Sequence, residues 1–454
     1  MSTTDHRDPM PTNPAADPEA PTPSDSTSAL SRRGFLRVSA LAGIGATAAT
    51  VAACTTAAAP SWSFPPAPSV QPQPSVTPAP SVAPSVAPSV APSVAPSPAP
   101  SASPSGSPTV PAVLPAGWTE HDWLAREKVR RYLGKLAVPL AGVFGAKLAA
   151  IVGAEDGYPQ LRELPEFAKV EQGGAPLAPR IDGDTKVFDL TVDRMEHRID
   201  ALLPPFQAFG YNKLWPGPLL RVTEGDKVRA VFTNNLTQTT GTHFHGVGFD
   251  DFYMDGIPFL TQLPIVPGET YPYEFVAKPY GSLMYHSHHN ATEQVGGGLL
   301  GAFIVDPADP KETYKEKFGV TQEYVWISND STGFTINGHG FPATVPIVAA
   351  KGERVLVRFM NEGIMMHPWH SHGFRMKVVA RDGAPLGTAA FECDTLGVNP
   401  GERFDAIIEC DRTGIWAFHC HILPHVEGPD GMFGMVTALV VTPGPVDVGA
   451  LLKA

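Results

Sequence analysis

Residues 418–425 read Phe418-His419-Cys420-His421-Ile422-Leu423-Pro424-His425, and Met432 follows shortly afterwards. Because successive side chains of a β-strand point to opposite faces, His419 and His421 should share one face while Cys420 takes the other. A thiolate, an imidazole and a weak thioether are the ligands of a blue-copper electron-transfer site, and His425 and Met432 are placed to supply them beside Cys420. One strand is therefore expected to serve two metal sites, with the flanking histidines facing the second.

The N-terminal residues have the pattern of an export signal. Ser31-Arg32-Arg33-Gly34-Phe35-Leu36 precede a weakly apolar run that is too short to span a bilayer comfortably, and this resembles a twin-arginine signal. The run ends at Val51-Ala52-Ala53-Cys54, which resembles a lipoprotein box in which Cys54 would carry a lipid anchor. Ordinary cleavage that removes Cys54 is the alternative. We expect residues 1–54 to direct the protein to the periplasm or the cell surface.

Residues 55–115 are dominated by Pro, Ala and Ser and repeat Ala-Pro-Ser-Val. This composition cannot build a core and favours a disordered linker with extended polyproline II character, at about 3.1 Å per residue. Residues 116–183 are expected to form a helical or irregular extension, with Thr119 as the N-cap of a helix that Pro139 breaks or kinks. We expect the extension to pack against the main domains.

Charge and cysteine content limit the classes of partner and fold. The formal charge of −12 and the lack of a basic cluster outside the signal argue against a nucleic-acid partner. The chain has 4 cysteines, too few for a disulfide scaffold. With Cys420 assigned to a metal, Cys393 and Cys410 either form a disulfide in an oxidising compartment or remain two separate buried thiols.

The β-rich part of the chain repeats itself. The stretch from Glu224 to Asn234 is echoed from Lys351 to Asn361, and the histidine motifs fall in step with it. Short alternating runs between turns rich in Gly, Pro, Asn and Asp indicate strands throughout. We therefore predict two homologous β-sandwich domains at residues 184–307 and 323–445, joined by a linker at 308–322 and followed by a tail at 446–454.

The repeat fails at two positions that matter for the metal chemistry. Ser287 stands where Cys420 stands, and Thr240 stands where His367 stands. The first domain therefore lacks both key ligands of a thiolate copper site. Only the second domain is expected to carry one, from His367, Cys420, His425 and Met432.

Eight further histidines form four His-x-His pairs, two in each repeat. Four pairs in step with a repeat are very unlikely by chance, although one such pair would carry little weight. Imidazole suits several transition metals, but the adjacent thiolate site narrows the choice to copper. The pairs are His243 and His245, His286 and His288, His370 and His372, and His419 and His421.

These motifs resemble those of the multicopper oxidases. The resemblance implies two cupredoxin-like Greek-key domains that bind one type 1, one type 2 and two type 3 copper ions per functional unit. His243 and His370 would hold the type 2 copper, and Met432 would be the axial type 1 ligand, with Met435 a weaker candidate because the spacing after His425 is longer than usual. The type 3 pair would be held by His245, His286, His288, His372, His419 and His421.

The same resemblance points to two carboxylates that supply protons. Asp255, in Met254-Asp255-Gly256, matches the position of a family carboxylate near the cluster; an ordinary turn Asp before Gly is the alternative. Glu427 is expected to serve the other side of the cluster.

The function implied is that of a laccase-like enzyme, which oxidises a reductant one electron at a time near His425 and reduces O2 to water at a trinuclear cluster. Roughly eighty residues separate His288 from His367, too few for a third domain. The chain thus resembles two-domain oxidases that close into homotrimers with clusters at subunit boundaries. The reductant is left open among phenols, aromatic amines, Cu(I) and Fe(II).

Two other functions agree less well with these motifs. A copper nitrite reductase carries its thiolate copper in the first domain, and Ser287 and the four complete pairs speak against it. A non-catalytic copper-binding or electron-transfer lipoprotein would leave the eight histidines without a purpose.

Overall fold

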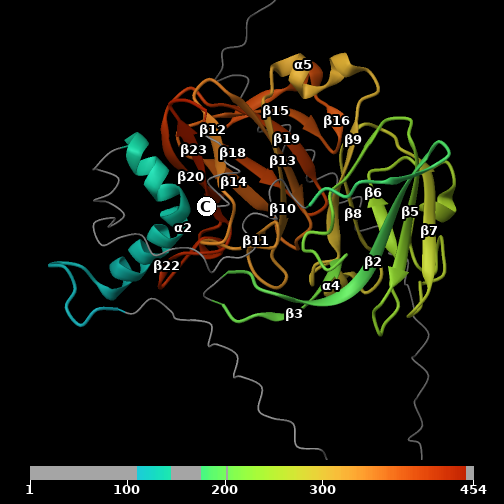
Figure 1. Ribbon diagram of the computed structural model, residues 1–454, viewed down its shortest axis with the longest axis horizontal. Coiled ribbons are helices and arrows are strands. Elements are labelled where there is room, and N and C mark those ends of the chain that lie inside the picture. The colour runs from blue at the N-terminus through green and yellow to red at the C-terminus, as the bar shows by residue number, and fades with distance from the viewer. Residues whose placement is uncertain (1–109, 145–174, 201–202, 446–454) are drawn as a thin grey trace, which may run out of the picture. The chain divides into compact units, whose positions relative to one another are not determined.

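The computed structural model describes residues 110–144, 175–200 and 203–445 (Figure 1). The predicted signal at 1–54, most of the predicted linker at 55–115 and the tail at 446–454 lie outside these residues. Within them, no helix combines the length and the apolar character needed to cross a membrane. Strands dominate the described part of the chain, and the predicted metal ligands lie on strands or shortly after their ends.

Two sheets pack into a first sandwich. One sheet has the order β1-β2-β5-β7, with β3 paired to β2, and the other has the order β4-β9-β8-β6. Inward-facing residues alternate along β5, and they join residues of β4, β6, β8 and β9 in a single apolar core. The strands are β1 (Arg180–Asp182), β2 (Thr185–His197), β3 (Phe206–Tyr211), β4 (Leu220–Thr223), β5 (Lys227–Asn234), β6 (Thr242–His245), β7 (Thr270–Val276), β8 (Gly281–Ser287) and β9 (Leu300–Asp306).

A second sandwich follows. Its sheets have the orders β11-β10-β13-β19-β15-β16, with β17 on β15, and β12-β23-β20-β14-β18, and its core includes Cys420. A short hairpin of β21 and β22 lies outside both sheets. The strands are β10 (Gln322–Asn329), β11 (Thr335–Ile336), β12 (Ile347–Ala350), β13 (Arg354–Asn361), β14 (His367–Ser371), β15 (Met376–Arg381), β16 (Ala384–Pro385), β17 (Phe391–Cys393), β18 (Thr395–Val398), β19 (Arg403–Glu409), β20 (Gly414–Cys420), β21 (Glu427–Gly428), β22 (Gly431–Met432) and β23 (Val436–Thr442).

The strand pairing repeats as the sequence does. The parallel pair β2 and β5 corresponds to β10 and β13, and the antiparallel pair β6 and β8 corresponds to β14 and β20. The parallel pair β4 and β9 likewise corresponds to β12 and β23. The predicted all-β fold of two cupredoxin-like sandwiches is therefore confirmed, whereas the predicted limits at 184–307 and 323–445 stay a prediction.

Short helical segments lie in the connections. They include η2 (Phe252–Met254) after β6 and η5 (Leu423–His425) after β20, the second of which carries a predicted copper ligand. The predicted linker at 308–322 contains η3 and α5. The remaining segments are α4 (Ala291–Gln294), η3 (Pro310–Glu312), α5 (Tyr314–Phe318) and η4 (Gly387–Ala389).

The helix α2 (Glu120–Phe144) precedes the sandwiches. Thr119 caps it as predicted, because its Oγ1 accepts a hydrogen bond of 3.2 Å from the Asp122 N–H. The predicted break at Pro139 is wrong, since the helix continues to Phe144. An interior proline costs a helix about 3 kcal/mol, and this does not end a helix whose earlier turns are held by tertiary packing.

This helix packs on the second sandwich, as expected for the extension (Figure 1). Tyr132 and Leu133 are buried in the second core. The Tyr132 hydroxyl lies 3.0 Å from Thr437 Oγ1 and accepts a hydrogen bond of 3.0 Å from the Ala438 N–H. Ala125 lies so close to Gly431 of β22 that a Cβ at Gly431 would meet it at 2.5 Å. The helix thus supports the hairpin that carries Met432.

A buried charged cluster joins the sandwiches. Ser282 of β8 donates a hydrogen bond of 2.5 Å to Asp405 of β19, and Arg358 of β13 lies 3.3 Å from the same carboxylate. Arg358 also pairs with Glu323 at 2.9 Å. Because the buried charges compensate one another, the cluster holds β8 firmly against the second sandwich.

The described cysteines form no disulfide: Cys393, Cys410 and Cys420 are free thiols. Cys410 is buried, and Cys393 is half-buried at the end of β17. Of the two alternatives for Cys393 and Cys410, separate thiols are therefore confirmed. Cys54 lies outside the described residues.

Candidate metal centres

His367, Cys420 and His425 converge inside the second sandwich. The Cys420 Sγ lies 3.7 Å from Nδ1 of His367 and 3.7 Å from Nδ1 of His425. Trp369 pairs with Cys420 across β14 and β20, which brings the start of β14 beside the end of β20. All three donors are buried and close enough together to bind one metal ion.

Burial shifts the pKa of the two histidines and the pKa of the cysteine in opposite directions. It lowers the pKa of His367 to about 4 and also lowers the pKa of His425, so both imidazoles are neutral at pH 7. It raises the pKa of the Cys420 thiol to about 11. Binding of a metal must therefore displace the thiol proton, whereas the imidazoles already offer lone pairs.

Both candidate axial methionines lie near this cluster. Met432, on β22, is partly buried against the core that contains Cys420. Met435 is fully buried; its N–H donates to the His425 carbonyl at 3.0 Å, and its own carbonyl accepts from the Cys420 N–H at 3.0 Å. Met432 stays the predicted axial ligand.

A buried carboxylate that the sequence reading missed faces His367. Asp330 Oδ2 lies 3.7 Å from His367 Nε2, and the Asp330 side chain is 1% exposed. The carboxylate accepts hydrogen bonds from the N–H groups of Ile364 at 2.6 Å and Met365 at 3.1 Å. His367 Nε2 is buried and has no hydrogen-bond partner. Asp330 therefore favours the tautomer with the proton on Nε2, which leaves Nδ1 for the metal.

Asp330→Asn should weaken metal binding at this cluster. Loss of a carboxylate behind a ligating imidazole typically lowers metal affinity or activity by about 10- to 100-fold, and we expect an effect of that size. Titration of the metal-free protein with copper, followed by visible absorption, measures it. Asp411→Asn, at an exposed position, is the control. Equal titration curves for the two variants would show that Asp330 does not orient His367.

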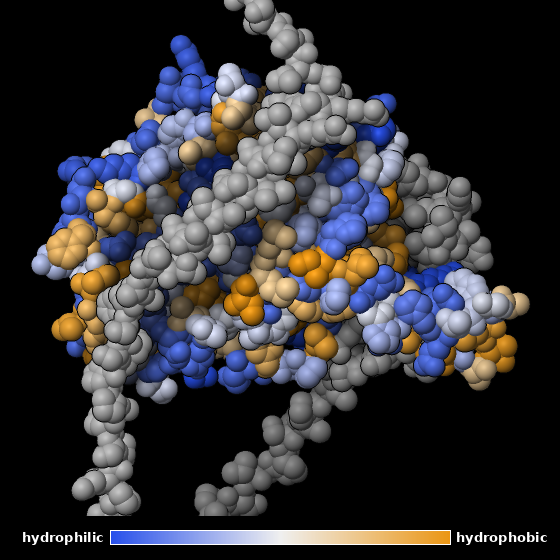
Figure 2. Space-filling model, turned by 180° about the vertical axis from the view of Figure 1, so that it is seen from behind, coloured by the Kyte–Doolittle hydropathy of each residue, from blue (hydrophilic) through white to orange (hydrophobic). Residues whose placement is uncertain are grey.

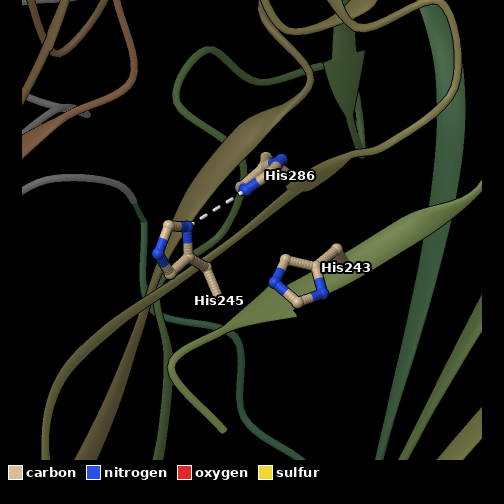
Figure 3. Close-up of side chains that lie close together, drawn as sticks. All are labelled: His243, His245 and His286. Atoms are coloured by element: carbon tan, nitrogen blue, oxygen red, sulfur yellow. Dashed lines mark hydrogen bonds between the residues drawn. The ribbon is translucent and has the colours of Figure 1, made fainter. Parts of the chain in front are cut away.

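Four histidines gather at the edge of the first sandwich. His243 and His286 are directly opposed on β6 and β8, and His245 Nδ1 lies 3.4 Å from His286 Nε2 (Figure 3). The His288 ring lies 5.8 Å from the His243 ring and 6.2 Å from the His286 ring. Burial, together with the nearby charge of Arg403, lowers the pKa of His245 to about 3.

Four histidines also lie close together in the second sandwich. His370 and His419 are directly opposed on β14 and β20, and the Nε2 atoms of His372 and His419 lie 3.0 Å apart. The ring of His421 lies 5.5 Å from that of His370 and 5.7 Å from that of His419. His419 and His421 thus share a side of the strand, and Cys420 belongs to the other cluster, as the alternation predicted.

Backbone carbonyls fix the orientation of four of these rings in the same way in both sandwiches. Nδ1 of His243 donates to the Asp255 carbonyl at 2.7 Å, and Nδ1 of His370 to that of Asp394 at 3.0 Å. Nδ1 of His286 and of His419 donates to the carbonyl of the next residue, at 2.9 and 2.8 Å. A proton held on Nδ1 leaves Nε2 free for a metal.

The two sets of four histidines do not meet within the described chain. All ring contacts among these eight residues lie within one set or the other. Each set therefore offers half of the ligands that were predicted for a single cluster.

The two predicted carboxylates lie in different places. Asp255 Oδ1 is 3.4 Å from His243 Nδ1, which places Asp255 beside the first histidine set. Glu427 is exposed on β21 and pairs with Met432, which places it beside the thiolate cluster. A role for Glu427 at the histidine sets stays a prediction.

Glu362 and Arg403 were also missed by the sequence reading. Glu362 lines the hollow that contains His243, His245, His286 and His288. A Cβ at Gly246, the residue after His245, would lie 2.7 Å from Arg403 Nη2. The repeat offered one indication of Glu362. Asn235 follows Asn234 in the first domain, whereas Glu362 follows the corresponding Asn361, so an acid stands where the first domain has an amide.

The chemistry of the donors fits copper. A buried thiolate with two Nδ1 imidazoles and a nearby thioether is a blue-copper set, and imidazoles with free Nε2 atoms suit the other copper types. Copper is therefore the metal for which these residues are arranged.

Comparison with known proteins gives the same result. Residues 197–310 and 314–444 match two multicopper oxidase domain models. The solved multicopper oxidase mgLAC is 35% identical, over 58% of this chain and 88% of that chain, with a TM-score of 0.54. The blue copper oxidase from Nitrosomonas europaea is 31% identical, over 57% of this chain and 86% of that one, with a TM-score of 0.53.

Among curated proteins, the iron transport multicopper oxidase FET5 of Saccharomyces cerevisiae is 32% identical over 227 residues, 44% of this chain and 36% of that protein. Dihydrogeodin oxidase of Aspergillus terreus is 27% identical over 272 residues, 52% of this chain and 44% of that protein. The chain spans less than half the length of these curated relatives. The matched domains and the copper-type donor sets together assign the chain to the multicopper oxidase family.

Proposed function

We propose that this protein is a laccase-like oxidase that couples one-electron oxidation of a reductant near His425 to the four-electron reduction of O2 to water. The observation that carries the proposal is the position of Cys420 between His419 and His421. One strand end thereby links a buried thiolate cluster with two of eight imidazoles arranged for metal binding.

The side chains around the thiolate cluster have different roles in electron transfer. Bound copper supplies the redox chemistry at both kinds of site. The bonds from the Cys420 side chain through the backbone to His419 and His421 provide a short covalent path for electrons. Phe334 stacks on His425 with ring centroids 4.1 Å apart, so the imidazole is shielded from water on that side. Electrons from a reductant enter beside His425 and pass from there to Cys420.

Protons must accompany the electrons, because each O2 takes up four of both to become two water molecules. Asp255, whose carboxylate lies 3.4 Å from His243, is suited to pass protons toward the first histidine set. Glu427, exposed beside Met432, is the second acid that we expect to take part.

The complete cluster is proposed to form between subunits of a homotrimer. Each chain offers two separate sets of four histidines, so that the first-sandwich set of one subunit can face the second-sandwich set of the next, in a ring that closes. Large exposed apolar side chains support an interface: Phe259, Leu260 and Leu263 are 76–78% exposed shortly after Asp255. Figure 2 shows hydrophobic groups at several places on the visible face, among hydrophilic ones.

Export is proposed to follow the twin-arginine route, with the mature protein in the periplasm or at the cell surface. The paired arginines at Arg32 and Arg33 and the box ending at Cys54 support this, and a lipid on Cys54 would anchor the protein. The matching copper resistance protein A of Escherichia coli is 36% identical over 157 residues, 35% of this chain and 24% of that protein.

The competing functions are less well supported. A nitrite reductase would need its thiolate copper in the first sandwich, where Ser287 instead donates a hydrogen bond of 2.7 Å to Gln294. An electron carrier would not need eight further imidazoles, four of which are oriented by backbone carbonyls.

Oxygen uptake with defined reductants tests the proposal. With a phenol, Cu(I) or Fe(II) supplied in turn, we expect one O2 to be consumed for every four electrons, without accumulation of hydrogen peroxide. The ratio of rates among the three identifies the class of reductant. Nitrite reduction without O2 uptake, or peroxide as the main product, would contradict the proposed function.

A further inference from the structure

An acidic side chain of the second sandwich reaches the histidines of the first. Glu362 directly follows β13, yet it lines an open hollow of about 400 Å³ together with His243, His245, His286 and His288. The rest of the lining comes from α4 and the residues that follow it, from Ser331, Asn361, Gly363 and Ile364, and from Gly401. The hollow is therefore a shared feature of both sandwiches of one chain.

The backbone holds Glu362 firmly at this place. Its N–H donates to the Ser328 carbonyl at 2.9 Å, and its carbonyl accepts from Asn329 Nδ2 at 3.0 Å. Its side-chain Oε1 is buried and has no hydrogen-bond partner among the described residues. An unpaired buried carboxyl oxygen costs about 1–3 kcal/mol, so its retention calls for an explanation beyond packing.

The surroundings favour the protonated acid. Burial raises the pKa of Glu362 to about 8, although Arg403 of β19 acts in the opposite direction. The other titratable groups that face it are the buried Tyr211 of β3 and the four imidazoles of the first set. The carboxyl group thus lies, with one buried and unpaired oxygen, in the lining of the hollow that the four histidines share.

The repeat shows that this acid is not part of the shared framework. Asn235 occupies the corresponding position of the first sandwich, is exposed, and donates a hydrogen bond of 2.9 Å to Asp193. Only the second sandwich places a carboxyl group at this point, where it lines the same hollow as the histidines.

We propose that Glu362 is a proton donor for the reduction of O2 in the histidine-lined hollow. The inference rests on the proposed function. The O–H bond of the carboxyl group breaks and its proton passes to an oxygen atom that originates from O2. Four protons and the four electrons from four one-electron oxidations of the reductant convert one O2 into two water molecules. Glu362 then regains a proton from solvent.

The test uses the copper-loaded full-length protein and ferrocyanide, a one-electron reductant that releases no proton. Glu362→Gln keeps the size of the side chain but cannot donate an acidic proton, and Glu362→Asp restores the acid. Glu316→Gln, at an exposed position on α5, is the control. Three quantities are measured: anaerobic reduction of the blue chromophore, its reoxidation by O2, and the solvent deuterium isotope effect on reoxidation, each against pH.

For Glu362→Gln we expect unchanged anaerobic reduction and about 100-fold slower reoxidation, the lower end of what a positioned acid contributes. In the unmodified protein, reoxidation should fall as pH rises, because only the protonated form of a carboxyl group can donate a proton. This fall and the isotope effect should disappear in Glu362→Gln and return in part in Glu362→Asp.

Rates are normalised to the near-ultraviolet absorption of the coupled copper pair, so that loss of metal is not mistaken for loss of proton transfer. Normal reoxidation per intact cluster in Glu362→Gln, or an unchanged pH profile, would overturn the inference. If the unmodified protein itself consumed no O2, the proposed function would fail instead, and the two failures are thereby distinguished.

Discussion

Cys420→Ser is expected to abolish substrate oxidation while leaving the eight histidines able to bind metal. The Cys420 Sγ lies 3.7 Å from both imidazole Nδ1 atoms, and no other described cysteine is part of this donor group. A serine hydroxyl is a poor substitute for a thiolate as a copper ligand. Because the loss of a group behind a ligand already costs about 10- to 100-fold, loss of the thiolate should lower turnover by at least about 100-fold.

The measurements are visible absorption, copper content and O2 uptake. The blue band should vanish, one copper per chain should be lost, and the near-ultraviolet band of the coupled pair should remain. Cys393→Ser is a matched control, because Cys393 is a free and only half-buried thiol on β17. A Cys420→Ser protein that still oxidised a phenol at the normal rate would contradict the assignment of Cys420 as the point where electrons enter.

Separation of the subunits is expected to abolish O2 reduction as completely as Cys420→Ser abolishes substrate oxidation. Leu260→Glu together with Leu263→Glu should convert the proposed homotrimer into monomers, because burying two carboxylates in the proposed apolar interface is far more costly than exposing them. Both side chains are exposed in the chain, so the substitutions should leave the sandwich folded. The thiolate site lies within one chain and should stay blue, whereas the incomplete histidine sets should lose the coupled copper pair.

Analytical ultracentrifugation gives the mass, and absorption gives the two copper types on the same samples. Ile181→Glu, an exposed apolar residue on β1, is the control that should remain trimeric. A stable monomer that kept the full near-ultraviolet band and normal O2 uptake would falsify the shared-cluster proposal.

Much of the site could be predicted from the chain because the relevant information is local. The alternation of a strand sends Cys420 one way and its neighbours the other, and the structure has this arrangement. The echo of Glu224–Asn234 in Lys351–Asn361 likewise anticipated the matching strand pairs of the two sandwiches. The N-cap at Thr119 was predicted correctly for the same reason, since capping involves only neighbouring residues.

Predictions that depend on contacts between residues far apart in the chain were less reliable. Pro139 does not end α2, because burial of Tyr132 and Leu133 stabilises the helix independently of its local sequence preference. Spacing alone could not separate a disulfide from two thiols for Cys393 and Cys410, which are free in the structure.

The sequence by itself predicted which residues bind copper and grouped them into a thiolate set and two imidazole sets, and the described residues lie in these groups. Ligand chemistry depends on residue type, and the order of the motifs follows the repeat. Only the tertiary structure shows which acids lie close to those residues. Asp330 and Glu362 directly follow β10 and β13, and their burial and proximity to the histidines arise from the packing of strands far apart in the chain.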